Sequence, residues 1–246
     1  MNGSIYKPIV LIDKPRGISS NKALTKIKGV IRSHLQCGNK DLPKIGHGGT
    51  LDPEATGLLV VGLTREGTRK LNDHINEDKV YECEIDLLKE SETGDLEKFK
   101  QMEIGDMIVP NLDLVQSVIM SKFVGKIKQI PPAYSALKIQ GKKACDLARN
   151  GHEVVLSSRE ITIYAIDILD FKFPILKLRV HCSKGTYIRT LGQDIGKALE
   201  LYGTLISLRR LKSGSHEILD AINLNDLKFS DLLLLPSEIN QINQIN

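Results

Sequence analysis

The sequence lacks several features that mark particular classes of protein. It has no tryptophan, only 4% aromatic residues, and four widely spaced cysteines without a CxxC pair. This cysteine usage favours neither a zinc site nor a disulfide framework, so we expect reduced and mostly buried thiols. No stretch approaches the roughly 18 consecutive apolar residues that a membrane span needs. The start of the chain has no apolar segment typical of a secretory signal, so we expect a cytoplasmic protein.

What is present is ordinary for a globular protein. The chain has 246 residues, of which 41% are hydrophobic and 26% are charged. At roughly 100–200 residues per domain, this length suits one large domain or two small ones, and we expect one domain over residues 1–236. Residues 237–246 form a short polar repeat that is typical of a frayed tail.

Positive charge is concentrated in one segment. The formal net charge is only +4, yet the segment from Lys122 to Arg149 contains seven basic residues and one acidic residue, a local balance of +6. The remainder of the chain is therefore slightly acidic. A phosphate backbone is the commonest partner of such a segment, and a solvated surface stretch is the alternative.

The hydrophobic pattern predicts a mixture of strands and helices. Strands are expected at 8–12, 58–63, 79–87, 160–169, 175–182 and 204–211. Helices are expected at about 19–32, 64–75 and 110–124 and after Gly185, with a polar loop at 34–45. Because strands and helices do not alternate regularly, the sequence favours the α+β class over a doubly wound sheet.

Two of these elements have an expected buried face. In the strand at 79–87, we expect Val80, Cys83, Ile85 and Leu87 to lie roughly on one side. In the helix at 110–124, the expected apolar positions are Leu114, Val118 and Phe123.

The most distinctive segment is KIGHGGTLDPEATG, residues 44–57, which places four glycines, His47 and Asp52 around one tight turn. Glycine permits positive φ and the close approach of a ligand to the backbone. Pro53 biases Asp52 toward an extended backbone, which helps to project its carboxylate from the loop. Taken alone, an Asp-Pro pair is more often a simple turn, and a single histidine is more often structural.

Five segments together resemble one protein family. GHGGTLDPEATG closely resembles the signature loop of the TruB family of pseudouridine synthases, the bacterial and organellar enzymes of tRNA uridine-55. Four other segments resemble further motifs in the family's order: IDKPRGISSNKAL the first motif, KVYEC the tyrosine strand, IPPAYSALKIQGKKACDLARNG the RNA-gripping thumb, and VHCSKGTYIRTLGQDIG the arginine motif. The last strand, LISLRRLKSG, is also similar, and the resemblance covers residues 8–227.

The resemblance implies a pseudouridine-synthase fold. A catalytic domain over residues 1–236 would have a central mixed, largely antiparallel sheet flanked by helices, and a thumb loop at about 122–157. Family members commonly carry a C-terminal RNA-binding module of the PUA type, which this chain is expected to lack. We therefore expect weaker or more salt-sensitive RNA binding. The segment LLKESETGDLEKFKQ also replaces the acidic strand and loop that usually follow the tyrosine strand.

The resemblance also assigns roles to residues. It makes Asp52 the catalytic nucleophile, places Tyr81 against the flipped base and pairs Arg189 with the Asp52 carboxylate. Substrate-binding roles are implied for residues of the signature loop, the first motif, the thumb, the arginine motif and the last strand: His47, Gly48, Gly49, Thr50, Lys14, Lys138, Lys142, Lys143, Arg149, Lys184, Tyr187 and Leu208. Lys14 is expected to support the active-site loop, and Arg209, Arg210 and Lys212 to form a second basic edge.

These residue types suit the isomerisation of uridine, which breaks the N-glycosidic bond, turns the base and rejoins it through carbon. A guanidinium lowers the pKa of a neighbouring carboxyl and keeps the nucleophile ionised. Extruding a base costs a few kcal/mol, which stacking on an aromatic side chain offsets. Whether the carboxylate attacks the ribose, adds to the base or abstracts a ribose proton stays open. Neither a cofactor nor a metal is implied.

The expected partner is the T-arm of tRNA, without a guide RNA, an obligate protein partner or a membrane. A monomer is expected, in the cytoplasm or in an organelle of a eukaryote. Three alternatives remain: a T-arm binding and folding chaperone with secondary or no catalysis, a pseudouridine synthase that acts on another RNA, and a generic basic RNA-binding module. The last of these would leave the five ordered motifs unexplained.

Overall fold

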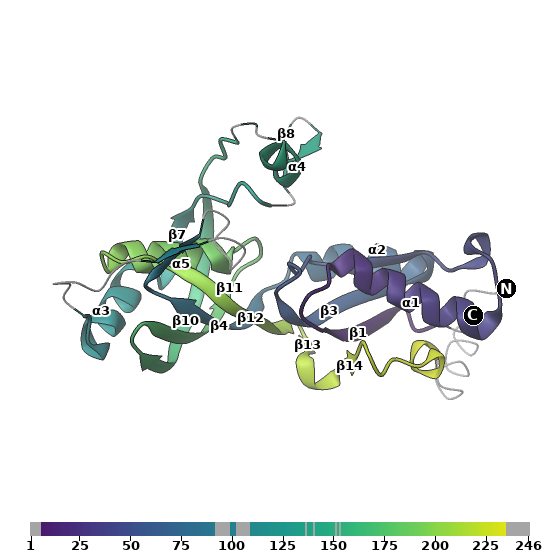
Figure 1. Cartoon of the computed structure of the whole chain (residues 1–246). Helices are drawn as coiled ribbons and strands as arrows, with labels where there is room; N and C mark the ends of the chain where they lie inside the picture. Colours follow the sequence, from purple (N-terminus) through teal and green to yellow (C-terminus); the bar gives the residue numbers. More distant parts are fainter. Residues whose placement is uncertain are drawn as a thin grey trace. The chain divides into compact units, whose positions relative to one another are not determined.

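The structure is a computed structural model, and it describes residues 6–91, 99–101, 109–135, 137–139, 141–150, 152 and 154–234. Its internal contacts divide the chain into two compact units. Unit 1 comprises Met1–Glu77 and Arg209–Asn246, and unit 2 comprises Asp78–Leu208. The expected single domain over residues 1–236 stays a prediction, and the expected tail at 237–246 lies outside the described residues. Figure 1 labels most of the helices and strands.

Unit 1 is built on a mixed sheet in which β3 is the central strand (Figure 1). β1 pairs with β3 antiparallel along its whole length, while β2 and β12 pair with the other edge of β3, antiparallel and parallel respectively. The short strands β14 and β13 extend β1 and β12. The strands are β1 (Ile9–Lys14), β2 (Ile45–Gly48), β3 (Thr56–Leu63), β12 (Thr204–Ser213), β13 (His216–Glu217) and β14 (Ile222–Asn223).

Two helices pack on the sheet of unit 1 because each has one apolar face. α1 (Ser20–Leu35) buries Ala23, Leu24, Ile27 and Ile31, and the side chain of its N-cap Ser19 accepts a hydrogen bond from the backbone N–H of Lys22. α2 (Thr64–Ile75) follows β3 directly. Both helices were predicted, although α1 continues three residues further than expected, into the predicted polar loop. Short 3-10 turns lie at Asn39–Asp41, Ile218–Asp220 and Phe229–Leu232.

Unit 2 contains a sheet in the order β12-β4-β11-β10-β7, to which β12 contributes its residues up to Leu208. The pairs β4–β11, β11–β10 and β10–β7 are all antiparallel. Two small hairpins, β5–β6 and β8–β9, form separate two-stranded sheets. The strands are β4 (Lys79–Asp86), β5 (Lys89–Ser91), β6 (Phe99–Gln101), β7 (Gly125–Gln129), β8 (Lys138–Ile139), β9 (Lys142–Lys143), β10 (Arg159–Lys172) and β11 (Ile175–Cys182).

The core of unit 2 lies between its sheet and the helices α3 (Leu112–Lys122) and α5 (Ile188–Ala198). A third helix, α4 (Ala144–Arg149), follows β9. β4 contributes Cys83, Ile85 and Leu87 to the core. The predicted membership of Val80 in this face is wrong, because side chains alternate along a strand and Tyr81, Cys83, Ile85 and Leu87 are the positions that meet the core.

The predicted apolar face of α3 is rotated. The helix buries Val115 and Ile119, whereas Leu114 is 49% exposed; Val118 and Phe123 do pack against the core. Apolar residues occupy neighbouring positions on this helix, so spacing alone does not select the buried stripe. Packing against the sheet selects it.

The α+β class is confirmed, since both units combine a sheet with packed helices. The buried thiols of Cys83 and Cys182 have pKa values raised to about 12 by burial, so both are protonated at neutral pH. Cys37 is partly exposed, and the side chain of Cys145 lies outside the described residues. Within the described part of the chain, no helix combines the length and the apolar character needed to cross a membrane.

Candidate active site

Asp52 lies in the loop between β2 and β3, and contacts from the start of α1 fix the residues on both sides of it. The hydroxyl of Ser20 donates to the carbonyl of Leu51 at 2.9 Å and accepts from the N–H of Leu51 at 2.9 Å. On the other side, the N–H of Gly17 donates to the carbonyl of Pro53 at 2.9 Å. Leu51 is buried, while Asp52 stays partly exposed. The Asp52 carboxylate therefore lies on a loop in which hydrogen bonds fix the residue before it and the residue after it.

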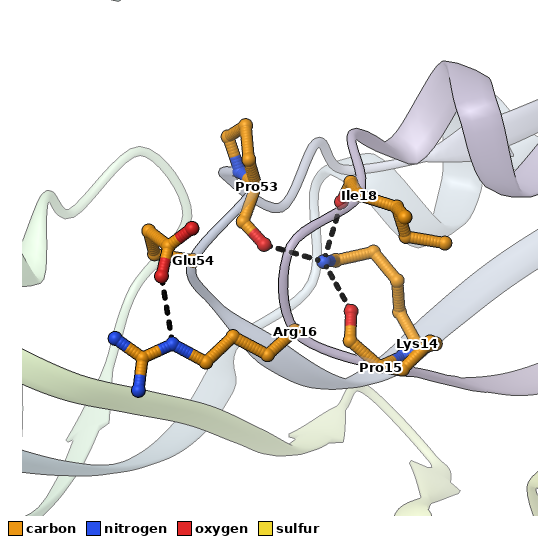
Figure 2. Close-up of polar contacts among 6 residues, drawn as sticks. All are labelled: Lys14, Pro15, Arg16, Ile18, Pro53 and Glu54. Carbon is orange, nitrogen blue, oxygen red and sulfur yellow. Dashed lines mark hydrogen bonds and ion pairs between the residues drawn. The ribbon is translucent and has the colours of Figure 1, made fainter.

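Lys14 is fully buried beside this loop. Figure 2 shows its ammonium group donating to the carbonyls of Ile18 at 2.7 Å, Pro15 at 2.9 Å and Pro53 at 3.2 Å. Burial lowers the pKa of Lys14 to about 8, although the carboxylates of Glu54 and Asp52 oppose this shift. Lys14 is thus protonated at neutral pH and can make all three bonds. Its role in substrate binding stays a prediction.

Arg210 is a second buried cation among the described residues of unit 1, with 1% of its surface exposed. Its Nε donates to the carbonyl of Leu58 at 2.7 Å, and its Nη2 donates to the carbonyl of Gly49 at 3.0 Å. Gly49 has φ of +81°, and a Cβ there would lie 3.2 Å from Nη1 of Arg210. The guanidinium therefore ties β12 to β3 and to the glycine turn that precedes Asp52.

The predicted basic edge of Arg209, Arg210 and Lys212 is wrong. Arg210 is interior, because its guanidinium satisfies backbone carbonyls of unit 1. Arg209 makes two hydrogen bonds to the carboxylate of Asp13, at 2.7 and 3.0 Å, and Lys212 pairs with Glu217 at 2.9 Å. The sequence signal for Arg210 is weak, since an interior arginine in a strand resembles a polar edge position.

Gly57, the last residue of the signature loop, is required by a close backbone approach. Its φ is +96°, and a Cβ there would lie 2.3 Å from the carbonyl oxygen of Arg210. The two residues are register partners in the parallel β3–β12 pair. Glycine at this position therefore allows β12 to lie against β3 at the base of the loop.

The remaining predicted residues of the loop differ in exposure. His47 is partly buried on β2, and both burial and the charge of Arg210 lower its pKa, so its imidazole is neutral at neutral pH. Its Nδ1 is buried and has no hydrogen-bond partner among the described residues. Gly48 is buried against Leu71 of α2, and Thr50 is exposed. His47 and Thr50 thus remain the loop side chains best placed to meet a ligand.

In unit 2, Arg189 occupies the first turn of α5 and is only 5% exposed. Its Nη2 donates to the carbonyl of Tyr134, in the segment that follows β7, at 2.8 Å. Tyr187 precedes the helix and exchanges two hydrogen bonds with the side-chain amide of Gln129, at 2.8 and 3.1 Å. The guanidinium of Arg159 lies 4.9 Å from the centre of the Tyr187 ring. These contacts, which the sequence did not predict, fix the start of α5.

Tyr81 on β4 and Leu208 on β12 are both partly buried and pack against the core of unit 2. That core includes Ile188, the residue between Tyr187 and Arg189, so unit 2 builds these predicted residues around one hydrophobic cluster. Lys184 is exposed.

The thumb residues are described only in part. The backbones of Lys138, Lys142, Lys143 and Arg149 lie in β8, β9 and α4, whereas their side chains lie outside the described residues. Asp52 belongs to unit 1, and Tyr81 and Arg189 belong to unit 2, so the pairing of Arg189 with Asp52 stays a prediction. Among the residues that the structure describes, no three His, Cys, Asp or Glu side chains are arranged to hold a metal ion.

Sequence comparisons identify relatives over most of the chain. The family model described as TruB family pseudouridylate synthase (N terminal domain) matches residues 36–188. The chain is 42% identical to the tRNA pseudouridine synthase B of Francisella philomiragia over 234 residues, covering 92% of this chain and 72% of that protein. It is 39% identical to the tRNA pseudouridine synthase B of Endomicrobium trichonymphae over 226 residues, covering 92% of this chain and 93% of that protein.

Two solved structures contain a chain with the same fold. The chain is similar to a protein chain in the crystal structure of a Cbf5-Nop10-Gar1 complex. The TM-score is 0.66 and the identity 29%, and the match covers 89% of this chain and 53% of that chain. It is also similar to a protein chain in an H/ACA RNP bound to a substrate RNA containing 2'-deoxyuridine. The TM-score is 0.61 and the identity 26%, and the match covers 92% of this chain and 58% of that chain. The chain thus spans a little over half the length of these solved chains, and the predicted pseudouridine-synthase fold is confirmed. Together with the family match and the relatives at about 40% identity, these findings show that the chain belongs to the TruB family of pseudouridylate synthases.

Proposed function

We propose that this chain is a tRNA pseudouridine synthase that isomerises uridine-55 of the T-loop, with Asp52 as the catalytic carboxylate. The relatives at 39–42% identity are named tRNA pseudouridine synthase B. The relatives from the Cbf5 and H/ACA complexes are only 26–29% identical. The higher identity to the proteins named tRNA pseudouridine synthase B favours tRNA as the substrate over the RNA bound by the H/ACA RNP.

The observation that carries the role of Asp52 is the fixing of its loop. Leu51 and Pro53, the residues on either side, are both hydrogen-bonded to the segment Lys14–Ser20. A reactive group that is held in place before the substrate arrives loses little entropy during the reaction. The loop therefore suits a carboxylate that must meet one sugar or base atom in a defined position.

Electrostatics within unit 1 favour an ionised Asp52. The Asp52 carboxylate raises the pKa of Lys14, and the interaction is reciprocal, so the Lys14 ammonium stabilises the charged carboxylate. We propose that Arg189 supplies the second cation and that Tyr81 stacks on the flipped base. In the reaction the C1′–N1 bond breaks, a C1′–C5 bond forms, the C5 proton leaves to solvent and N1 gains a proton. Bonds and protons balance in this isomerisation, so it needs neither an oxidant nor a reductant.

The thumb would hold the tRNA through its phosphates. Lys138, Lys142, Lys143 and Arg149 follow one another on β8, β9 and α4, as expected of a basic segment that positions RNA without reading its bases. We further propose that the protein acts as a monomer in the cytoplasm, without a guide RNA or an obligate protein partner.

The test is tritium release from a tRNA transcript labelled at C5 of uridine, in EDTA and without added cofactors, followed by mapping of the modified position. The purified protein is compared with Asp52→Asn and with Asp73→Asn, which alters an exposed carboxylate on α2 of the same unit. We expect release from one T-loop uridine by the protein and by Asp73→Asn, and none by Asp52→Asn. Tight T-arm binding without release by the unaltered protein would instead favour the RNA-folding chaperone.

A further inference from the structure

Helix α1 carries a concentration of positive charge that the proposed chemistry does not use. All of its charged residues are basic. Lys22 and Lys26 lie on one flank of the exposed side of the helix, and Lys28 and Arg32 lie on the other flank, roughly 120° away around the helix axis. We call these four residues together the α1 cationic face. The surrounding segment, residues 14–47, contains eight lysines and arginines against one acidic residue. The local balance of +7 over these 34 residues is similar to the +6 over residues 122–149, so positive charge is not concentrated in one segment alone, contrary to the prediction.

The charges of the α1 cationic face are not neutralised by the fold. Lys22, Lys26 and Arg32 are exposed, and within the described part of the chain no ion pair involves any residue of the face. The polar partners of Lys26 and Arg32 are the neutral side-chain oxygens of Asn225 and Asn39. Two cations elsewhere in unit 1 are paired, Lys70 with Glu66 and Lys212 with Glu217.

The arrangement of these charges opposes the stability of the helix. Lys22 and Lys26 are four residues apart, as are Lys28 and Arg32, so each pair lies on neighbouring turns. Like charges at this spacing destabilise a helix by about 0.2–0.5 kcal/mol per pair. Arg32, in the last turn, is favourably placed for the helix dipole, but the repulsion within each pair opposes the helix, and a negatively charged partner would relieve it.

The face begins at the candidate active site. The hydroxyl of Ser20, the first residue of α1, is hydrogen-bonded to both backbone groups of Leu51, the residue before Asp52. From there the 16 residues of α1 extend for about 24 Å. An RNA strand that presents a nucleotide to Asp52 and continues along α1 would place its phosphates beside the α1 cationic face.

A groove adjoins the same helix. It lies between α1 and the segment 224–229, has a volume of about 800 Å³, and is lined by Lys26, Ser33, His34, Asn225 and Phe229 with three apolar residues and Gly29. The exposed ring of His34 stacks on Phe229, with ring centres 4.0 Å apart and planes 12° from parallel. No carboxylate lines the groove among the residues described. A cation, an amide and a stacked ring form a surface chemically suited to a strand of RNA.

We propose that the α1 cationic face and the adjoining groove bind the phosphate backbone of the substrate tRNA outside the flipped nucleotide, as a second RNA-binding surface in addition to the thumb. The inference rests on the proposed function for the identity of the RNA. It concerns positioning alone, because none of these residues contacts the reacting atoms.

The experiment measures the affinity for an unmodified tRNA transcript between about 50 and 200 mM salt. Two double variants, Lys22→Ala with Lys26→Ala and Lys28→Ala with Arg32→Ala, are compared with a control double variant, Lys70→Ala with Lys212→Ala. The control removes two exposed cations of the same unit that are already paired with carboxylates. Circular dichroism and urea unfolding check that each variant is folded.

Each lost phosphate contact lowers the slope of log K against log salt concentration by roughly 0.7–0.9. We therefore expect the slope of each α1 variant to fall by about 1.5, with a tenfold or greater loss of affinity at low salt, while the control keeps both values. The single-turnover rate at saturating tRNA should stay within about twofold of the unaltered protein, since Asp52 is untouched. An unchanged salt slope in both α1 variants, or an equal fall in the control, would overturn the proposal.

The measurements distinguish a failure of the proposed function from a failure of the second RNA-binding surface. If the unaltered protein binds tRNA but releases no tritium, the proposed function fails, and the salt slopes still report whether α1 binds RNA. If tritium is released normally and the slopes of the α1 variants match that of the unaltered protein, the second surface fails alone.

Discussion

Replacing Lys14 with methionine tests how a buried cation supports the catalytic loop. The substitution keeps a long unbranched side chain and removes three hydrogen bonds to backbone carbonyls. Pro53 retains a donor, the N–H of Gly17, whereas Pro15 and Ile18 lose the donor that Lys14 supplies. Two carbonyls without a donor cost about 1–3 kcal/mol each.

An opposing effect comes from the charge. Burial lowers the pKa of Lys14 from 10.5 to about 8, so the fold disfavours its charged form by roughly 3 kcal/mol at neutral pH, and methionine removes this cost. The two effects largely cancel, and we expect Lys14→Met to lower the free energy of unfolding by no more than about 3 kcal/mol. Urea unfolding at pH 7 measures this change.

Lys14→Met should lower the activity more than the stability, because the loop that carries Asp52 loses the hydrogen bond from Lys14 to the carbonyl of Pro53. A misplacement of about 1 Å costs roughly 10²-fold in rate, so we expect a loss of that size in single-turnover tritium release by Lys14→Met. A fall of the unfolding free energy by more than about 5 kcal/mol, together with an unchanged rate in the folded fraction, would refute the reasoning.

The same lysine predicts a pH dependence with opposite signs for stability and activity. Above about pH 8 the folded state loses the Lys14 proton while the unfolded state keeps it up to about 10.5, so the contribution of this group to stability rises over that range. A neutral amine has only two N–H donors for three carbonyls, so the rate should fall through the same range. The rate of Lys14→Met should not show this fall at alkaline pH. If the variant shows the same fall, another group is responsible for it.

Three further substitutions test other parts of the structure. Gly57→Ala places a Cβ 2.3 Å from a backbone carbonyl oxygen at a φ of +96°, so urea unfolding should show a loss of more than about 2 kcal/mol, whereas Gly29→Ala, in open space on α1, should add about 0.5–1 kcal/mol. Arg189→Lys keeps the charge but loses the planar fork, so single-turnover release should fall by roughly 10²-fold, while Arg179→Lys, on an exposed strand position, should leave it unchanged. Tyr81→Leu should lower kcat/KM by about 5- to 150-fold through lost stacking, and a similar loss in Tyr81→Phe would contradict a stacking role.

The sequence predicted the elements best where a capping residue and a periodic apolar face coincide. α1 starts at Ser20, within one residue of the expected start, and β10 and β11 match the strands expected at 160–169 and 175–182. Prediction was poorer where apolar residues occupy adjacent positions, as on α3, because the buried stripe then depends on the packing partner. β2, at Ile45–Gly48, was not expected, since its glycines weaken every local strand signal.

The candidate site was predictable from its motifs, but the contacts that support it were not. Asp52, Tyr81 and Arg189 stand in segments whose resemblance to the family is specific. Ser20 and Gln129 support those segments through hydrogen bonds between residues that are 31 and 58 positions apart in the chain. No local pattern encodes such pairs, because they form only when the sheet and the helices are assembled.

The charged residues show most directly what the sequence alone cannot predict. A count along the chain treats Arg210 and Lys26 alike, although the fold buries Arg210 among backbone carbonyls and leaves Lys26 exposed, with only a neutral oxygen as its partner. The count also gives equal weight to Lys212, which a carboxylate of the same unit neutralises. Only the charges that remain after this internal pairing can attract a phosphate backbone. In unit 1 four such charges lie on α1, so the salt slope of the α1 variants, rather than the net charge of the chain, tests whether this helix binds RNA.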